Sequence, residues 1–222
     1  MMASKEILRA DHFERRWPVV LQLLVVVGIA THPARIHIMP LWFGYSLAVA
    51  CILPMVAVGI SRGGLRWTHL EHWSNLAICA LGETVVLLTL YHIITEMLRT
   101  PTAFTGEQLL ATSIAAWTIN VVTFSVVFWQ IDRGGPEARA NRLGKKPEWL
   151  FPQASGPDAE AAEWMPMSAD YLFLSFCTAT AFSPTDVAPV TTRAKMLMMV
   201  ESAISLITLV IVASRAINIL GS

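Results

Sequence analysis

Residues Asp170 to Lys195, D-Y-L-F-L-S-F-C-T-A-T-A-F-S-P-T-D-V-A-P-V-T-T-R-A-K, decide how this chain folds. Their apolar part, Tyr171 to Phe182, is 12 residues long, whereas a helix needs about 20 residues to cross a bilayer. A polar turn with two prolines follows, and Ala194 to Leu220 is then long enough to cross. This order predicts a re-entrant helix and loop, which persists at membrane depth only where protein or a water-filled cavity surrounds it.

The composition of the whole chain indicates an integral membrane protein. Hydrophobic residues make up 55% of the 222 residues, charged residues only 14%, and the mean hydropathy is +0.54. Such a chain is too apolar for an ordinary soluble domain, so its first partner is the lipid bilayer. The formal net charge is zero, which gives no reason to expect nucleic acid. Nucleophile-elbow, P-loop, Rossmann and H-E-x-x-H motifs are missing from the sequence, so we expect neither an enzyme nor a bound cofactor or metal.

Four apolar runs before the re-entrant stretch predict membrane-spanning helices. The first begins near Phe13 and ends before Pro33, although Pro18 to Ala30 also fits the apolar part of a secretory signal peptide. With the last helix, these runs predict an all-α membrane bundle of five crossings plus one re-entrant helix and loop. The other three predicted helices before that stretch are Leu41–Ile60, Trp73–Leu98 and Leu109–Ile131.

Charge divides the chain into three regions. Residues 132–168 are rich in charge, glycine and proline, and they connect the four-helix region 1–131 to the re-entrant segment and last helix in 169–222. One apolar group in this connection, Trp149 to Pro152, is expected to dock at the membrane interface. With the N-terminus inside, every Lys and Arg except Arg35, Arg99 and Arg215 falls on the inner side. The positive-inside rule therefore predicts a cytoplasmic N-terminus, and either a re-entrant segment that enters from the cytoplasm or a different number of helices before that segment.

Other conspicuous side chains have structural explanations. His69 and His72 are expected in a solvated turn before the third helix, because a metal site would need more ligands at defined spacing. The cysteines lie inside apolar runs and are expected to be packing residues: Cys51, Cys79 and Cys177. Tryptophans near the predicted helix ends are expected to form interfacial belts: Trp17, Trp42, Trp67, Trp73 and Trp129.

Ser175 to Thr191 resembles, without a gap, the pore signature of potassium-type channels, S-F-x-T-x-T-T-V-G-Y-G-D-x-x-P-x-T. The positions that match are Ser175, Phe176, Thr178, Thr180, Asp186, Pro189 and Thr191. The two filter glycines are replaced by Ser183 and Thr185, and the tyrosine between them by Pro184. The whole chain also resembles a family of uncharacterised bacterial multi-pass membrane proteins, a domain of unknown function, whose ending is similar to T-A-F-S-P-T-D plus a long last helix. This second resemblance implies a bacterial inner membrane.

The channel resemblance implies a pore whose constriction is lined by backbone carbonyls that replace the hydration shell of a small monovalent cation. Because one chain supplies a single loop, it also implies a cyclic homo-oligomer, most simply a tetramer. Asp186 would form an acidic ring at the mouth, or pair with Arg193. Thr178 and Thr180 would offer oxygen atoms to an ion, or bond back to their own helix. The filter-like residues are Thr178, Ala179, Thr180, Ala181, Phe182, Ser183, Pro184, Thr185 and Asp186.

Two carboxyl groups are predicted near the middle of the bilayer, where such groups are costly and indicate function. Glu83 is in the third helix and Glu201 in the last, and each would serve in transport or fasten helices together. Helical spacing also predicts a largely polar stripe on the last helix, which would line water or form a helix interface. The residues of the stripe are Glu201, Ser205, Thr208, Val212 and Arg215.

Three functions fit these observations. The first is a channel-like protein that passes a small cation as a homo-oligomer. The second is a non-conducting accessory subunit that retains a channel-like scaffold, which the loss of both filter glycines would favour. The third is a proton-coupled carrier that uses Glu83, Glu201 and His92, the last of these being a histidine within the third helix.

Overall fold

The structure, a computed structural model, describes residues 65–100, 104–140, 146–154, 164–181 and 187–220. The first two predicted helices and the filter-like residues Phe182 to Asp186 lie outside the described residues. The elements are, in chain order, α3 (Leu65–Arg99), α4 (Gly106–Ile131), η1 (Asp132–Gly134), α5 (Pro136–Ala140), β1 (Trp149–Leu150), η2 (Pro152–Ala154), α7 (Ser168–Thr180), β2 (Ala188–Pro189) and α8 (Thr192–Leu220).

Three of these helices are long and apolar enough to cross a membrane. The segments that meet this requirement are His72–Arg99, Gly106–Gly134 and Thr192–Ala213. The predictions of the third, fourth and last helices and of the short helix before the last one are therefore confirmed, although α3 begins at Leu65 rather than Trp73.

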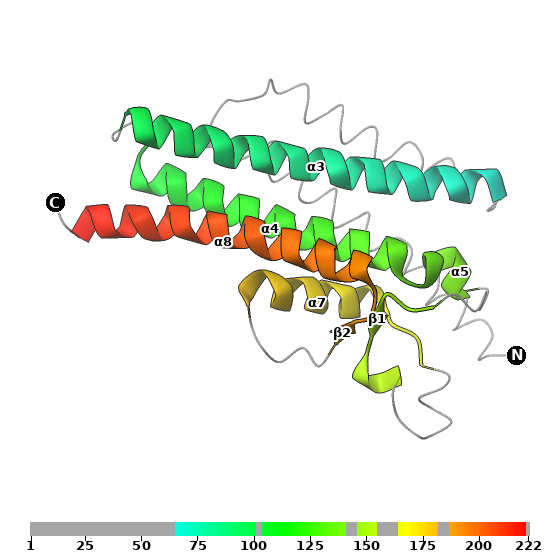
Figure 1. The fold of residues 1–222 in the computed structure, drawn as a ribbon. Helices are drawn as coiled ribbons and strands as arrows, with labels where there is room; N and C mark the ends of the chain where they lie inside the picture. Colours follow the sequence, from blue (N-terminus) through cyan, green and yellow to red (C-terminus); the bar gives the residue numbers. More distant parts are fainter. Residues whose placement is uncertain (1–64, 101–103, 141–145, 155–163, 182–186, 221–222) are drawn as a thin grey trace, which may run out of the picture.

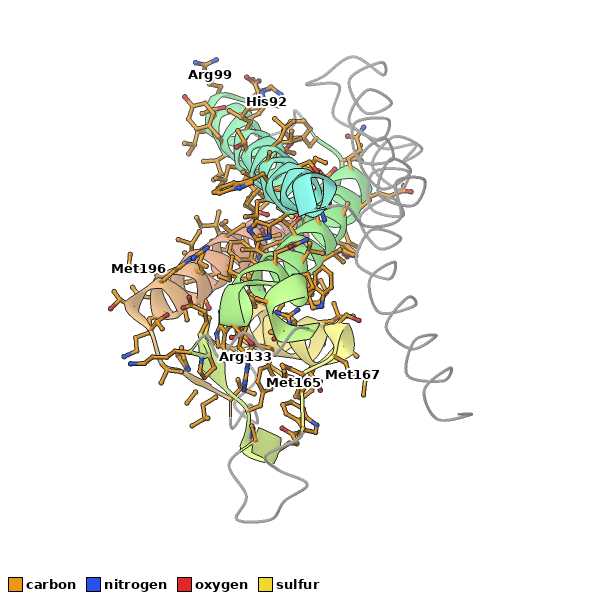
Figure 2. The ribbon with its side chains drawn as sticks, turned by 90° about the vertical axis from the view of Figure 1, so that its right-hand side faces the viewer. His92, Arg99, Arg133, Met165, Met167 and Met196 are labelled. Carbon is orange, nitrogen blue, oxygen red and sulfur yellow. The ribbon has the colours of Figure 1, made fainter. Side chains whose placement is uncertain are left out.

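The three long helices lie side by side, with α4 between α3 and α8 (Figure 1). His72 near the start of α3 contacts Gln130 near the end of α4, with Nδ1 and Oε1 2.9 Å apart. Further along α3, His92 packs edge-on against Phe104, just before α4. The helices α3 and α4 therefore run antiparallel, and α4 and α8 do so too. Figure 2 looks down the bundle from the end that carries α5, with α7 below α4.

The short helix α7 accompanies α4 and α8 for only part of their length (Figure 1). At its first turn the Tyr171 hydroxyl donates to Asp132 Oδ2, 2.6 Å away at the end of α4. At its last turn the Thr178 carbonyl accepts a hydrogen bond from the Ser202 hydroxyl at 3.1 Å. Ser202 lies about 15 Å along α8 from the start of that helix, at 1.5 Å per residue. The 13 residues of α7 therefore end roughly half-way along the bundle.

After α7 the chain returns to the end of the bundle where that helix began. Leu150 of β1 pairs with Ala188 of β2, and the Val190 N–H donates to the Glu148 carbonyl at 2.9 Å. The Thr191 hydroxyl then accepts from the Ala194 N–H at 3.1 Å, which satisfies one of the free donors at the start of α8. The segment around α7 thus enters and leaves the bundle at one end.

A buried polar cluster holds this end together; we call Asp132, Arg139, Glu148 and Tyr171 the Asp132 cluster. Besides the Tyr171 hydroxyl, Asp132 accepts the Glu148 N–H at Oδ1, 2.7 Å away. The Arg139 guanidinium donates to the carbonyls of Trp129 and Asp132, at 2.7 and 2.8 Å, and lies over the Trp129 and Tyr171 rings. Three separate segments are therefore fixed to the end of α4.

A left-handed turn makes this cluster possible. Arg133, Gly134 and Gly135 have φ values of 52°, 85° and 97°, a region that L-residues avoid and glycine tolerates. A Cβ atom on Gly135 would lie 2.9 Å from the Gln130 carbonyl oxygen, closer than packed atoms approach. The turn reverses the chain after α4, so that α5 carries Arg139 back over Trp129.

The polar connection departs most from the sequence predictions. It contributes to a two-stranded antiparallel sheet, so the described part of the chain is not purely α-helical. Two residues of the apolar group, Trp149 and Phe151, are buried in the core. Trp149 packs on Phe128, with ring centroids 4.6 Å apart, and Phe151 packs edge-on against Tyr171. These two residues are thus part of the protein's own core, whereas Leu150 and Pro152 are exposed.

Two further predictions differ from the structure. Trp129 is buried beneath Arg139 rather than exposed at a helix end. His69 and His72 do not belong to a loop, since both fall within α3, and His72 contacts Gln130 inside the bundle. Cys79 and Cys177 are buried and not in disulfides, as predicted of packing residues, and Cys51 lies outside the described residues.

Candidate functional site

The candidate site is a group of buried polar side chains half-way along the bundle, where α7 ends between α4 and α8. We call Glu83, Asn120, Ser175, Glu201 and Ser205 the mid-bundle cluster. Four helices contribute to it, one residue each from α3, α4 and α7 and two from α8. Asn120, Ser175 and Glu201 are completely buried, and Ser205 is nearly so.

Glu201 is the centre of this cluster. Its Oε1 contacts the Ser175 hydroxyl of α7, whereas its Oε2 is buried and has no hydrogen-bond partner among the described residues. An ionised carboxylate with an unsatisfied oxygen in an apolar interior is very costly, because it loses its hydration without compensation. The surroundings of Glu201 therefore favour the neutral acid.

The Ser175 hydroxyl supports the same conclusion by counting protons. Its oxygen lies 2.7 Å from the Val121 carbonyl oxygen and also contacts Glu201 Oε1. A hydroxyl has one proton to donate, and a carbonyl can only accept. If Ser175 donates to Val121, then the contact with Glu201 is a hydrogen bond only when Glu201 carries the proton and donates it. Both contacts are satisfied together by a protonated Glu201.

Asn120 joins α4 to α8 beside Glu201. Its Nδ2 donates to the Ser205 hydroxyl at 2.8 Å and to the Glu201 backbone carbonyl at 3.2 Å. Its Oδ1 is buried and has no partner in the part of the chain that the structure describes. An acceptor thus remains free next to the carboxyl group, in a position where a water molecule or a proton donor would be stabilised.

Glu83 reaches the cluster from α3. Both of its carboxyl oxygens are buried, and within the described ranges neither has a hydrogen-bond partner. Glu83 lies on α3, which contacts α8 as well as α4. Next to it, Gly82 packs against α4, where an added Cβ would contact Thr123 Oγ1 at 4.0 Å. Two carboxyl groups from different helices therefore place buried oxygens inside the described part of the protein.

The predicted stripe on α8 faces the interior of the chain. Glu201, Ser205 and Thr208 are buried, and the Thr208 hydroxyl donates to the Ile204 carbonyl of its own helix. Val212 is half-buried, and the Arg215 side chain lies outside the described residues. In the single chain the stripe forms a helix interface, the second of the two interpretations. The outward side of α8 is apolar and exposes Met196, Met199, Val200, Leu206, Leu209 and Val210.

The filter-like residues that the structure describes lie at the end of α7. The Thr178 hydroxyl donates to the Leu174 carbonyl at 2.8 Å, and the Thr180 hydroxyl donates to the Phe176 carbonyl at 2.8 Å. Both threonines therefore bond back to their own helix. Ala179 is half-buried, and Ala181 ends the helix in the left-handed conformation, with φ of 52°.

His92 does not join the two glutamates. It lies about 14 Å further along α3 than Glu83, at 1.5 Å per residue, and it packs against Phe104. Figure 2 places it, with Arg99, on the side of the bundle away from α7. No group of three or more His, Cys, Asp or Glu residues suited to a metal ion occurs among the described residues.

Sequence reasoning missed two members of the cluster. Asn120 is one of two amides between Leu109 and Ile131, the other being Gln130, and a strongly polar residue inside a membrane helix is the signal that could have identified it. Ser175 was noted only as a match to the channel signature. Its contact with Glu201 joins residues 26 positions apart, which no local pattern predicts.

Comparisons of the chain with protein-family models, curated proteins and solved structures give no match. The resemblances to potassium-type channels and to a bacterial membrane family therefore depend on the quoted residues alone. The geometry of the mid-bundle cluster and of α7 is the main evidence for function.

Proposed function

We propose that the protein is a membrane protein that passes a small cation, with α7 as a re-entrant half-helix and the mid-bundle cluster beside its end. The observation that supports this most is the path of α7, which enters the bundle beside Asp132, ends near Ser202, and is followed by a return to the same end. A 13-residue helix is about 20 Å long, against about 30 Å of hydrocarbon in a bilayer.

The end of α7 suits a cation. The carbonyl end of a helix carries a partial negative charge, and α7 ends part-way along the bundle, beside α4 and α8, rather than at either end of the bundle (Figure 1). Glu201 and Glu83 add carboxyl oxygens nearby. Both features lower the free energy of a positive charge at a depth where a bilayer raises it.

The arrangement in the membrane completes the proposal. The protein has five crossings, a cytoplasmic N-terminus and a re-entrant segment that enters from the cytoplasm, in a bacterial inner membrane. A cyclic homo-oligomer, most simply a tetramer, brings the filter-like residues of several chains together, because a single loop encloses no pore. The Thr178 to Asp186 backbone then lines the constriction.

Flux through reconstituted protein tests the proposal. The purified full chain in liposomes is expected to carry K⁺, Na⁺ or H⁺ under an imposed potential, and Glu201→Gln is expected to change the rate or the ion preference. Glu96→Gln is the matched control, since Glu96 is a half-buried glutamate on α3 that pairs with Arg99 at 3.7 Å. Absence of flux of all three ions, at every potential and pH, would contradict the proposal.

One observation favours a second function, that of a non-conducting accessory subunit. Glu201 and Ser205 of the polar stripe contact α7 and α4, and between Val200 and Val210 the exposed side chains of α8 are apolar except for Ser202. In this alternative the mid-bundle cluster only fastens helices. A homo-oligomer whose axis is closed to water-soluble thiol reagents, tested with cysteines introduced along the exposed side of α8, would decide for the accessory subunit.

A further inference from the structure

The mid-bundle cluster contains more acceptors than donors, and this imbalance points to the occupant of the site. Four buried oxygen atoms have no partner among the described residues: both carboxyl oxygens of Glu83, Glu201 Oε2 and Asn120 Oδ1. Both amide protons of Asn120 are already committed to α8. The Ser175 proton is claimed by the Val121 carbonyl or by Glu201. Within the described part of the chain, the cluster therefore has too few protons for its acceptors.

We infer that the cation taken by this cluster is a proton, held at Glu201 and exchanged with Glu83 inside a single chain. This inference rests on the proposed function and names its ion. A proton on Glu201 makes the carboxyl a donor to Ser175, which leaves the Ser175 hydroxyl free to donate to Val121. A proton on either carboxyl also removes the repulsion between two buried negative charges.

Among the described residues, the groups around Glu201 neither donate a proton to it nor carry a charge that balances its own. From α4 and α7, the groups that contact Glu201 are the Asn120 amide, at the backbone carbonyl, and the Ser175 hydroxyl, at the side chain, and neither ionises near neutral pH. The buried thiols on α3 and α7, Cys79 and Cys177, are neutral there as well. Among the described residues, neither Glu83 nor Glu201 forms a salt bridge. The two glutamates therefore set the protonation of the cluster together.

A metal cation fits this site less well than a proton does. A bound Na⁺ or Ca²⁺ needs several oxygen ligands that converge on it. Here the four unpartnered oxygens belong to side chains on three different helices, α3, α4 and α8, and Glu201 Oε1 and the Ser205 hydroxyl already contact Ser175 and Asn120. A proton needs only one oxygen and one acceptor, and the cluster already offers such a pair at Glu201 and Ser175.

The test is modification by dicyclohexylcarbodiimide, an apolar reagent that attacks protonated carboxyl groups inside membranes. The full chain in phosphatidylethanolamine and phosphatidylglycerol liposomes would be treated across a range of pH, and the modified residues identified by peptide mass spectrometry. We expect modification at Glu201 or Glu83 that falls about tenfold for each pH unit above its midpoint. A large excess of Na⁺ should not protect the site.

The chain contains its own control. Asp132 is as deeply buried as Glu201, but both of its oxygens accept hydrogen bonds, so it is expected to remain unmodified. Glu201→Gln should abolish modification at that position and, by leaving a single carboxyl group, change the pH at which Glu83 reacts. If Glu201→Gln fails to fold, Glu83→Gln provides the same comparison, and labelling of the unaltered chain still tests the inference.

The outcomes separate this inference from the proposed function. Failure to modify either glutamate at any pH would overturn the inference, and so would protection by Na⁺, which would assign the site to a metal cation. Cation flux without pH-dependent modification would retain the proposed function and reject the proton. Modification without any flux would retain the proton site and reject transport.

Discussion

Two completely buried carboxyl groups, Asp132 at the end of the bundle and Glu201 at its middle, have opposite surroundings. Asp132 receives a hydrogen bond on each oxygen, and the Arg133 side chain lies 3.9 Å away. Glu201 has one contact on one oxygen and none among the described residues on the other. The comparison teaches that burial alone does not identify a functional carboxyl group. Asp132, with a hydrogen bond on each oxygen, connects separate segments of the chain, and we call these contacts the joint. Glu201, with an oxygen that lacks a partner in the described ranges, is suited to hold a proton instead.

The largest loss of stability is expected when the Asp132 side chain is removed. Asp132→Ala removes the acceptor for Tyr171 and Glu148 and leaves their donors buried. We expect a loss of about 3–5 kcal/mol in the free energy of unfolding, as when one partner of a buried polar pair is deleted. Thermal unfolding in detergent measures it, with Glu96→Ala as a control that should change stability by less than about 1 kcal/mol. A loss equal to that of the control would remove Asp132 from its structural role.

Loss of a single hydrogen bond to Asp132 should reduce the stability less. Tyr171→Phe keeps the ring between Phe151 and Arg139 but removes the hydroxyl that donates to Asp132. Because this hydrogen bond goes to a charged acceptor, we expect a loss of about 1.5–3 kcal/mol. Chemical denaturation followed by circular dichroism measures the change. Equal stability of the variant and the original chain would show that the Asp132 cluster does not need this bond.

Ser175→Ala tests the mid-bundle cluster at the contact between α7 and α8. It removes a neutral hydrogen-bonding group, so the expected loss of stability is about 0.5–1.5 kcal/mol. The same variant should also change the pH at which Glu201 reacts with the carbodiimide, which a purely structural serine would not do. An unchanged pH profile would separate Ser175 from the proton site.

Glu201→Gln should have the smallest effect on stability at neutral pH. An amide has the shape of the neutral acid, so if Glu201 is protonated we expect a change within about 1 kcal/mol. The matched variant at the other carboxyl group, Asp132→Asn, replaces one of two oxygens that each accept a hydrogen bond with an NH₂ group, and it is expected to cost more. Thermal unfolding of both variants gives the comparison, and a larger loss for Glu201→Gln would mean that Glu201 is ionised.

The ionisation of Tyr171 should change the stability of the protein only in alkaline solution. Burial raises the pKa of Tyr171 well above its ordinary value of 10.0, so above pH 10 the unfolded chain loses this proton while the folded chain keeps it. The stability due to Tyr171 is therefore fully present below pH 10 and falls as the pH rises toward the folded-state pKa. The difference in stability between the original chain and Tyr171→Phe should shrink in alkali, and a constant difference would exclude this linkage.

Much of the helical framework was predictable, whereas the contacts around it were not. Long apolar runs predicted α4 and α8 closely, because the length and polarity of a helix in a membrane are read from consecutive residues. The start of α3 was missed, since His72 looked like part of a polar turn until Gln130, 58 positions away, supplied its partner. The burial of Trp149 was missed because it depends on Phe128 and on the pairing of β1 with β2.

The sequence by itself determined that α7 is too short to cross a bilayer, that α8 is long enough, and that Glu83 and Glu201 lie within apolar helices. Only the tertiary structure decided that α7 ends beside Glu201, that Asp132 has complete partners, and that the polar stripe of α8 faces inward. The physical reason is that apolar length is a local property of consecutive residues. The protonation and satisfaction of a buried carboxyl group depend instead on atoms that folding brings from distant segments.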